Sequence, residues 1–408
     1  MKKIIKNILV FAAMMISIFT VCATVQAQNT YQDGDYTYTV EFGKATLEKY
    51  TGTGSNVVIP STLGGKPLVQ IRDCAFSTNE YINSVVIPDT VQELGHQVFY
   101  GCHNLQKVHL STSLISIPWM TFAECTNLKE INFPANVLEI GESAFSRCSS
   151  LKNIVCPNVK NLGYLCFSNC ISLQSAIFKK GIIENGGWIF NNCVNLENVV
   201  LPQGTLKIAG GTFSGCKALK HINIPASVTT IEICAFSESG LTEIIIPDTV
   251  KFCNSRILEG CLNLKKVEYH APNVPYSSFK NCISLKSVIL GEEVSKIEGD
   301  AFYGTTQLET LRIPLRTKMN YDSVRGAEAL HTIYGVKGSN AETVAKSVGL
   351  NFVPVKDISV KLNKTKLMLY TMKGKNTATL KAVVSGSTST PTWTSSDIGV
   401  VQVNTSGK

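Results

Sequence analysis

Cysteine is the residue type with the most chemical potential in this 408-residue chain, because eight of its 14 cysteines recur at nearly constant spacing. They are Cys102, Cys125, Cys148, Cys170, Cys193, Cys216, Cys261 and Cys282. Such a row could form disulfides, bind zinc or remain as buried thiols. The absence of any Cys-x-x-Cys pair disfavours zinc. The same position also holds Ser239, Thr305 and Ala327, which favours buried thiols over disulfides.

Histidine offers no pattern that would support catalysis. The six histidines are His96, His103, His109, His221, His270 and His331. The sequence contains no H-E-x-x-H zinc motif, no G-x-S-x-G nucleophile elbow and no phosphate-binding glycine loop. We therefore expect no catalytic residues, no cofactor and no metal site, and we do not expect an enzyme.

The regular cysteines belong to a longer repeat, and phenylalanine or leucine begins each copy. The copies begin at Phe76, Phe99, Phe122, Phe145, Phe167, Phe190, Phe213, Phe236, Leu258, Phe279 and Phe302. Cysteine or a small residue usually follows after three positions, leucine after six, and apolar residues after nine and eleven. Consecutive starts are 21 to 23 residues apart, and a period in the twenties is typical of a solenoid.

One copy, T-F-A-E-C-T-N-L-K-E-I-N-F-P, indicates the shape of a coil. Its apolar spacing resembles the L-x-x-L-x-L of a leucine-rich repeat, in which the last residues form a short strand. Alternate side chains of a strand point to opposite faces. Leu128, Ile131 and Phe133 should therefore face the core. Glu130 and Asn132 should face solvent.

The fold follows from stacking these copies, because no single coil can bury its own apolar side. The second half of each copy has a weaker motif with glycine at its turn, as at Gly141 and Gly299. We expect a mainly β leucine-rich repeat solenoid of about 11–12 coils of 21–23 residues. Caps at both ends and a partial immunoglobulin-like β-sandwich complete the predicted chain.

The outward residue ten positions after each repeat start, or nine positions after Phe236 because that copy is one residue shorter here, defines a candidate partner-binding face. In order it is Val86, His109, Asn132, Val155, Ile177, Val200, Asn223, Ile245, Glu268, Ile289 and Arg312. Six of these eleven are β-branched aliphatic residues on a face that should be wet. Either they simply suit strands, or they form an exposed apolar stripe for a partner. The nearby lysines Lys107, Lys265, Lys266 and Lys286 could steer an acidic ligand.

The amino terminus has the features of a secretion signal, which we assign to residues 1–27. Lys2, Lys3 and Lys6 precede an apolar run, and Val25-Gln26-Ala27 supplies a small-residue cleavage site. Lipid attachment at Cys22 is the disfavoured alternative. Cleavage would leave no transmembrane span and an odd number of cysteines, 13 of the 14. The net charge would fall from +8 to about +5 without a basic block, so we expect no nucleic-acid partner.

The repeat array, residues 61–335, is predicted to be capped at both ends. Residues 28–60 alternate around Gly43 as a β-hairpin does, and they should cover the first coil. Residues 336–354 contain a capping-box sequence, Ser339-Asn340-Ala341-Glu342, followed by one apolar helical face. Residues 355–408 alternate in short runs between glycine, serine and proline, as a β-sandwich does, but they are too few for a complete one.

With these residues in view, the array resembles the BspA-like leucine-rich repeat family of bacterial surface proteins. The family phrase L-x-x-I-x-I-P is present from Leu219 to Pro225, and it continues through Val228 and Ile231 to Ala235-Phe236. The resemblance covers about residues 35–354. The tail resembles the start of a group 2 bacterial immunoglobulin-like domain through its W-T-S-S-D and V-Q-V-N-T-S-G-K segments.

The resemblance implies a secreted, extracellular protein associated with the cell surface. It implies a binding or adhesion function toward a protein or glycan ligand, such as a host extracellular matrix protein, or toward other cells. No binding residue carries over, because the family motif defines none. We expect a monomer. The alternative interpretation is a non-binding spacer that presents a distal domain away from the cell surface.

Overall fold

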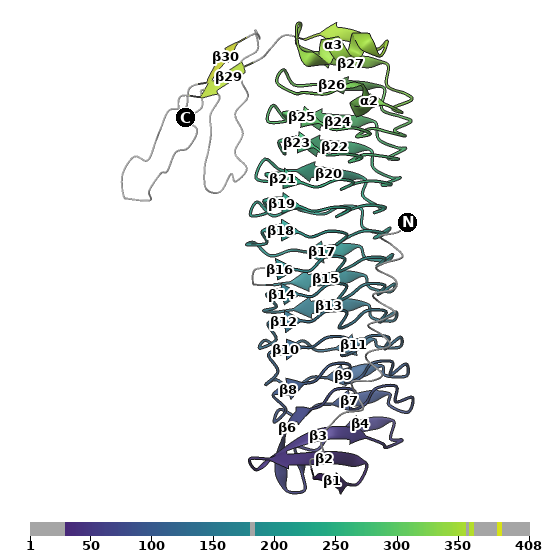
Figure 1. The fold of residues 1–408 in the computed structure, drawn as a ribbon, viewed down its shortest axis with the longest axis vertical. Helices are drawn as coiled ribbons and strands as arrows, with labels where there is room; N and C mark the ends of the chain where they lie inside the picture. The colour runs from purple at the N-terminus through teal and green to yellow at the C-terminus, as the bar shows by residue number, and fades with distance from the viewer. Residues whose placement is uncertain (1–28, 180–183, 356–358, 363–381, 386–408) are drawn as a thin grey trace, which may run out of the picture.

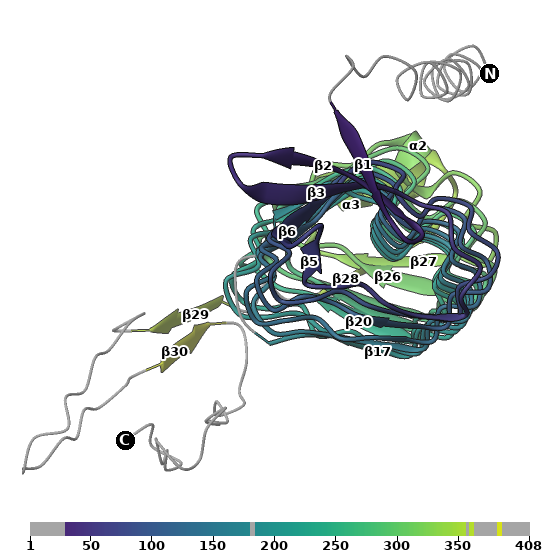
Figure 2. The ribbon, with the colours of Figure 1, turned by 90° about the horizontal axis from the view of Figure 1, so that it is seen from below.

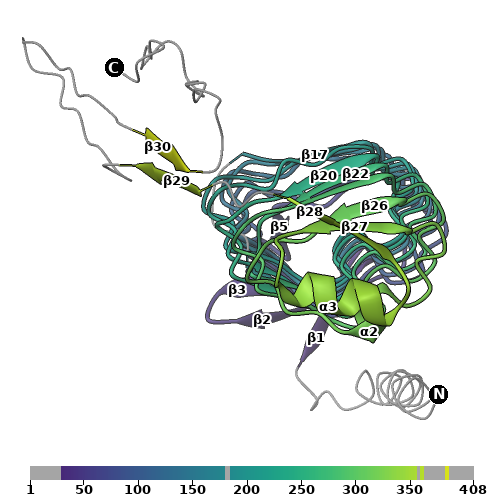
Figure 3. The ribbon, with the colours of Figure 1, turned by 90° about the horizontal axis from the view of Figure 1, so that it is seen from above.

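The computed structural model describes residues 29–179, 184–355, 359–362 and 382–385. The chain winds repeatedly about one axis and builds a rod (Figure 1). Viewed along the rod, successive coils overlie one another (Figures 2 and 3). Most coils contribute one longer strand and one two-residue strand. The prediction of a mainly β solenoid with little helix is therefore confirmed.

The longer strands form parallel pairs, which we call the long-strand ladder. Its strands are β4 (Asn56–Val58), β7 (Ser84–Val86), β9 (Lys107–His109), β11 (Glu130–Ile131), β13 (Asn153–Cys156), β15 (Ser175–Phe178), β17 (Asn198–Val200), β20 (Glu243–Ile246), β22 (Lys266–Tyr269), β24 (Ser287–Leu290), β26 (Thr310–Arg312), β27 (Thr332–Gly335) and β28 (Asn351–Pro354). Alternate side chains enter the core as predicted. In β13, for example, Ile154 and Cys156 are buried and Val155 is exposed.

The two-residue strands form a second set of parallel pairs, the short-strand ladder. It consists of β8 (Glu93–Leu94), β10 (Ser116–Ile117), β12 (Glu139–Ile140), β14 (Asn161–Leu162), β16 (Glu184–Asn185), β18 (Lys207–Ile208), β19 (Thr230–Ile231), β21 (Phe252–Cys253), β23 (Asn273–Val274) and β25 (Lys296–Ile297). Second residues such as Ile117 and Ile140 are buried. Both ladders therefore cover the same core.

Each phenylalanine that begins a repeat lies in a tight turn with two left-handed residues. Around Phe190, Trp188 has φ +51° and Asn192 has φ +56°, and the same two positions are left-handed along the array. Such a conformation costs a non-glycine residue about 1 kcal/mol or more. Hydrogen bonds between coils hold it: Trp188 N donates to Gly210 O at 2.7 Å and Phe190 N donates to Thr212 O at 2.9 Å.

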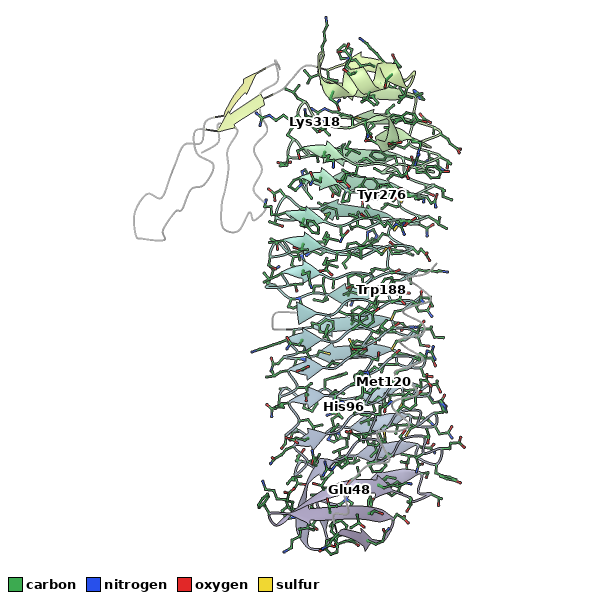
Figure 4. All side chains as sticks on the ribbon, in the orientation of Figure 1. Glu48, His96, Met120, Trp188, Tyr276 and Lys318 are labelled. Carbon is green, nitrogen blue, oxygen red and sulfur yellow. The ribbon has the colours of Figure 1, made fainter. Side chains whose placement is uncertain are left out.

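The turns also carry large side chains, and Met120, Trp188 and Tyr276 follow one another along the rod (Figure 4). The Trp188 ring lies so close over Gly211 that a Cβ there would clash with it. Tyr276 Oη donates to Asp300 Oδ2 of the next coil at 2.6 Å. These side chains bridge successive coils and help hold the left-handed turns.

The core is a stack of aromatic rings along the rod. Consecutive phenylalanines from Phe76 to Phe236 are stacked, with ring centroids 4.9–5.8 Å apart. Leu258 interrupts the column, and stacking resumes between Phe279 and Phe302. Fully burying one such side chain contributes about 1.5–3 kcal/mol before entropy is subtracted. The predicted sharing of apolar layers between coils is therefore present.

The regular cysteines form a row of buried thiols. Each donates a hydrogen bond to the carbonyl of the repeat start in the preceding coil, as Cys148 Sγ does to Phe122 O at 3.1 Å. The same bond runs from Cys102 to Phe76 and from Cys282 to Leu258. Within the described residues, the 12 cysteines from Cys102 to Cys282 form no disulfide. The predicted preference for buried thiols over disulfides is confirmed for these residues.

Glycine at the second turn allows successive coils to pack closely. Gly141 has no positive φ, and the left-handed residue is Ser143, two positions later. A Cβ on Gly141 would lie 2.9 Å from backbone atoms of Pro118 and Trp119 in the preceding coil. Glycine is needed there because two main chains pass in contact, rather than because the chain turns left-handed.

The amino-terminal end carries a mixed sheet. Its order is β1 (Thr30–Asp33), β2 (Tyr36–Glu41), β3 (Lys44–Tyr50), β6 (Lys66–Ile71) and β5 (Thr62–Leu63). The predicted hairpin is confirmed: β2 and β3 are antiparallel, and Phe42 and Gly43 between them both have positive φ, as a two-residue hairpin turn requires. The Tyr50 ring stacks on Phe76 at 4.9 Å and extends the aromatic column.

The carboxy-terminal end of the rod carries two helices, α2 (Tyr321–Val324) and α3 (Asn340–Ser347). The predicted apolar face of α3 is buried at Ala341, Val344 and Ala345. The predicted capping box is wrong. Ser339 Oγ makes no hydrogen bond, and Glu342 instead accepts from Gly338 N at 2.7 Å.

Beyond the rod, β29 (Ser359–Leu362) pairs antiparallel with β30 (Ala382–Ser385). This pair agrees with two of the predicted tail strands, and it does not establish an immunoglobulin-like domain. The rest of the tail, including the W-T-S-S-D segment, lies outside the described residues. So do the predicted signal segment, residues 1–27, and Cys22.

Candidate partner-binding face

Nine of the eleven predicted face residues lie in the strands of the long-strand ladder, on its outward side. Strand register places Val86 beside His109, Ile177 between Val155 and Val200, and Glu268 between Ile245 and Ile289. Register also adds residues to the column that the repeat count missed. They are Val58, Tyr334 and Val353. Each follows the repeat less closely in sequence, and strand pairing alone reveals it. We call the outward side of this ladder the long-strand face.

The aliphatic side chains of the long-strand face are wet, as expected. Val155 is 41% exposed, Val200 44% and Ile245 57%, and Ile177 is half-buried between the first two. Paired strands place Val155, Ile177 and Val200 side by side. They form a small exposed apolar stripe, which is the most partner-like feature predicted from the sequence.

The long-strand face is interrupted rather than continuous. Its strands fall into separate sheets, β4 to β11, β13 to β17, β20 to β24 and β26 to β28. In the coil of Phe213, no strand forms at residues 220–224, so Asn223 is not a strand residue as predicted. Asn132 also falls outside its short strand, β11. Although the coils are stacked throughout, the long strands therefore do not form one unbroken sheet.

Asparagine occurs at the first two interruptions, and it favours strands poorly. Asn132 Oδ1 accepts from Leu110 N at 2.8 Å, in place of the carbonyl that accepts this bond in regular coils. This bond lies on the side of β11 that still pairs with β9, so what the two interruptions share is the weak strand preference of asparagine. Asn223 occupies the same repeat position at the second interruption. No asparagine lies at this position in the third, where Arg312 follows Ile289.

The second interruption opens a groove of about 630 Å³ on the long-strand face. Its lining includes β17, the strandless segment and β20, with Asn223 and Ile245 from the predicted face. Glu197, Glu243 and Glu268 supply three acidic side chains. The basic groups in the lining are Lys266 and His221, and His221 Nδ1 lies 3.6 Å from Glu243 Oε1. A smaller hollow of about 380 Å³ lies at Asn132.

The lysines that were expected to steer an acidic ligand have different surroundings. Lys107 Nζ lies 2.9 Å from Glu130 Oε2, so its charge is partly neutralised. Within the described chain, no ion pair involves Lys265, Lys266 or Lys286. At the other end of the long-strand face, Arg312 pairs with Glu292 at 3.0 Å. The face therefore carries charges of both signs, and steering by these lysines stays a prediction.

Three of the buried thiols, Cys102, Cys125 and Cys148, are chemically quiet. Burial raises the pKa of the Cys102 thiol to about 12, and burial likewise raises the pKa values of Cys125 and Cys148 well above the usual range. Thiolate is the reactive form of cysteine, so these groups are poor nucleophiles at neutral pH. Across the described ranges, no group of three or more His, Cys, Asp or Glu side chains could hold a metal ion.

The repeat array matches the model of a known protein family. Residues 50–174, 150–265 and 206–331 match the model of the BspA type leucine-rich repeat region. Together these matches span well over half of the chain. The chain belongs to the BspA-type leucine-rich repeat family. Among curated proteins, none matches it.

Two solved structures support the fold of this BspA-type protein. A leucine-rich repeat protein from Bacteroides ovatus ATCC 8483 has 24% identity and a TM-score of 0.62, and the match covers 80% of this chain and 100% of that one. A leucine rich cell surface protein from Faecalibacterium prausnitzii A2-165 has 26% identity and a TM-score of 0.50, with 78% and 98% covered. The predicted leucine-rich repeat solenoid is confirmed.

The family narrows the function to a coarse class. Leucine-rich repeat proteins are protein-binding modules and are generally not enzymes, so the family is consistent with a binding or structural role. None of the helices in the described ranges has the length and apolar character needed to cross a membrane. Membership of the family does not identify the ligand, the cellular location or the binding residues.

Proposed function

We propose that this BspA-type protein is a secreted binding module at the bacterial cell surface, and that its long-strand face holds a protein or glycan partner. The exposed stripe of Val155, Ile177 and Val200 carries the proposal. A soluble rod gains nothing from wet aliphatic side chains, whereas a partner that covers them gains about 25 cal/mol for each Å² of apolar surface removed from water.

The location rests on two supports. Residues 1–27 have the pattern of a secretion signal, and a solved structure with 26% identity carries the description of a cell surface protein. The family resemblance adds the partner class. Host extracellular matrix proteins, such as fibronectin and fibrinogen, and other bacterial cells are the first candidates to test.

A serine substitution of the stripe tests the proposal. The full chain with Val155→Ser, Ile177→Ser and Val200→Ser should lose binding to immobilised matrix protein or to whole cells. A matched control replaces Ile115, Leu138 and Leu206, three exposed aliphatic residues beside the short-strand ladder, with serine. The control should bind as the unchanged protein does. Equal binding by both variants would exclude the stripe as the contact surface.

The competing function is a spacer that only holds a distal part of the chain away from the cell. The aromatic column favours it, because uninterrupted stacking from Phe76 to Phe236 makes a stiff rod. A spacer predicts that no partner binds the rod at all and that both serine variants behave like the unchanged protein in every binding assay.

A further inference from the structure

The groove on the long-strand face at the coil of Phe213 is a feature separate from the aliphatic stripe of Val155, Ile177 and Val200. We propose that this groove binds an extended, positively charged segment of a partner polypeptide through main-chain hydrogen bonds. The inference rests on the proposed binding function, because it names the kind of partner that the long-strand face takes. Extended peptides commonly add to open sheet edges in this way.

Open main-chain groups are the first argument. In regular coils, the residue eleven positions after the repeat start donates its N–H to the next coil, as Ile87 does to His109 O at 2.9 Å. The equivalent groups here are Leu201 N and Asn223 O, and neither makes a hydrogen bond in the described structure. The carbonyl of Glu197 also accepts none. An open strand edge is a ready template for another extended chain.

The room on the long-strand face is the second argument. Core ring spacing does not distinguish the groove, because the ring centroids of Phe167 and Phe190, whose coils pair through β15 and β17, are 5.7 Å apart and those of Phe190 and Phe213 are 5.8 Å apart. The groove volume of about 630 Å³ falls within the range of ligand-binding pockets.

Charge is the third argument, and it selects the partner. The groove is lined by Glu197, Glu243 and Glu268, against one lysine, Lys266, and one histidine, His221. With histidine neutral, the lining has a net charge of −2, three acids against one base. Complementary charge favours a basic segment and repels an acidic peptide or an anionic glycan. Main-chain recognition together with an acidic rim points to a lysine- or arginine-rich polypeptide.

The cause of the opening supplies the variant that tests it. Valine favours strands more than asparagine by up to about 1 kcal/mol, so Asn223→Val should restore the missing strand and close the groove. Amide hydrogen exchange at Leu201 reports the closure, because its N–H becomes protected once it is bonded. Asn132→Val is the matched control, since it repairs the other asparagine interruption and leaves this groove unchanged.

Fluorescence anisotropy with the full chain measures the binding. The probe is a labelled peptide of about eight residues, the length of one strand, that alternates lysine and threonine. A second peptide replaces lysine with glutamate, and a third carries N-methyl groups on alternate residues. We expect the basic peptide to bind at least about tenfold more tightly than the glutamate peptide or the N-methylated peptide. The glutamate peptide loses the charge-assisted hydrogen bonds, and the N-methylated peptide loses main-chain hydrogen bonds.

The variants then locate the site. Asn223→Val should weaken the basic peptide by about tenfold or more, the triple change of Glu197, Glu243 and Glu268 to glutamine should weaken it similarly, and Asn132→Val should leave it unchanged. Equal binding of the plain and N-methylated peptides overturns the proposal. So does unchanged binding by an Asn223→Val protein whose Leu201 amide has become protected. If the Leu201 amide stays unprotected in the Asn223→Val protein, the comparison of the plain and N-methylated peptides tests the proposal instead.

This result is separable from the proposed function. The serine-stripe variant keeps the groove, and the Asn223→Val variant keeps the stripe. A protein that captures its partner through Val155, Ile177 and Val200 but ignores every peptide would sustain the binding function and refute the groove. Binding of the acidic peptide or of an anionic oligosaccharide in preference to the basic peptide would refute the groove as well.

Discussion

The interior of the rod and its long-strand face come from the same coils, yet they obey different constraints. Inside, the same side chains recur: Phe122, Cys125 and Leu128 are all fully buried. The Phe122 ring stacks on Phe99 of the preceding coil, and Cys125 Sγ donates to Phe99 O. Outside, the repeated position holds valine, histidine, asparagine, glutamate and arginine. Stacking constrains the side chains that two coils bury between them. It does not constrain the outward side chains, which contact only solvent or a partner.

The largest test of this difference removes one ring from the column. Phe122→Ala should lower the free energy of unfolding by about 3–5 kcal/mol, because the ring is fully buried between Phe99 and Phe145. On the long-strand face, Val155→Ser should change it by less than about 0.5 kcal/mol. Denaturant unfolding of both proteins makes the comparison. Similar losses would remove the distinction between interior and face.

Sequence reasoning succeeded where stacking dictates the residue. The spacing of Phe122 and its counterparts gave the coil, the core and the direction of each strand residue, because a repeat has one way to share layers. It failed at Asn223, where a residue that favours strands poorly coincides with a break in the sheet and does not change the period. It also missed left-handed turn residues such as Trp188, since contacts between coils hold them and no glycine marks the position.

Alkaline pH should lower the stability of the folded protein, because the buried thiols resist ionisation. Burial raises the folded-state pKa of Cys102 to about 12, and it also raises those of Cys125 and Cys148, while an unfolded thiol ionises near 9.0. Below pH 9 the folded state loses nothing. As pH rises from about 9 toward 12, the unfolded state releases protons that the folded state retains, so stability should fall.

Denaturant midpoints measured from pH 8 upward check this prediction. The Cys148→Val protein is the control, because it removes one titrating thiol and keeps a similar side-chain volume. Its midpoint should depend less steeply on pH than that of the unchanged protein. Identical pH profiles would mean that Cys148 does not contribute to the alkaline loss.

Asparagine substitutions sharpen the comparison on the long-strand face. Asn223→Val and Asn132→Val should each raise the free energy of unfolding by up to about 1 kcal/mol, since each removes a poor strand former from a ladder position. Thermal unfolding measures the gain. A loss of stability in both would show that asparagine is not the reason why the ladder opens.

The smallest expected effect concerns a polar contact on the turn side. A hydrogen bond from Tyr276, with the nearby Arg325 guanidinium, holds the pKa of Asp300 below its usual range. The stability it contributes is present above the ordinary aspartate pKa and is lost as pH falls through the lowered one. Asp300→Asn should therefore lower the melting temperature slightly at neutral pH, and the difference should shrink in strong acid. A difference that does not depend on pH would contradict this.

The central claim is that the coils pack continuously in the core, whereas strand pairing on the long-strand face is interrupted in the coil of Phe213. Hydrogen exchange resolved to single coils tests this claim most directly. Amides of β15, which pairs on both sides, should be protected. The amides of residues 221–224 and of Leu201 should exchange far faster, while Phe213 N, bonded to Ala235 O at 2.8 Å, stays protected. Equal protection of β15 and residues 221–224 would contradict the account.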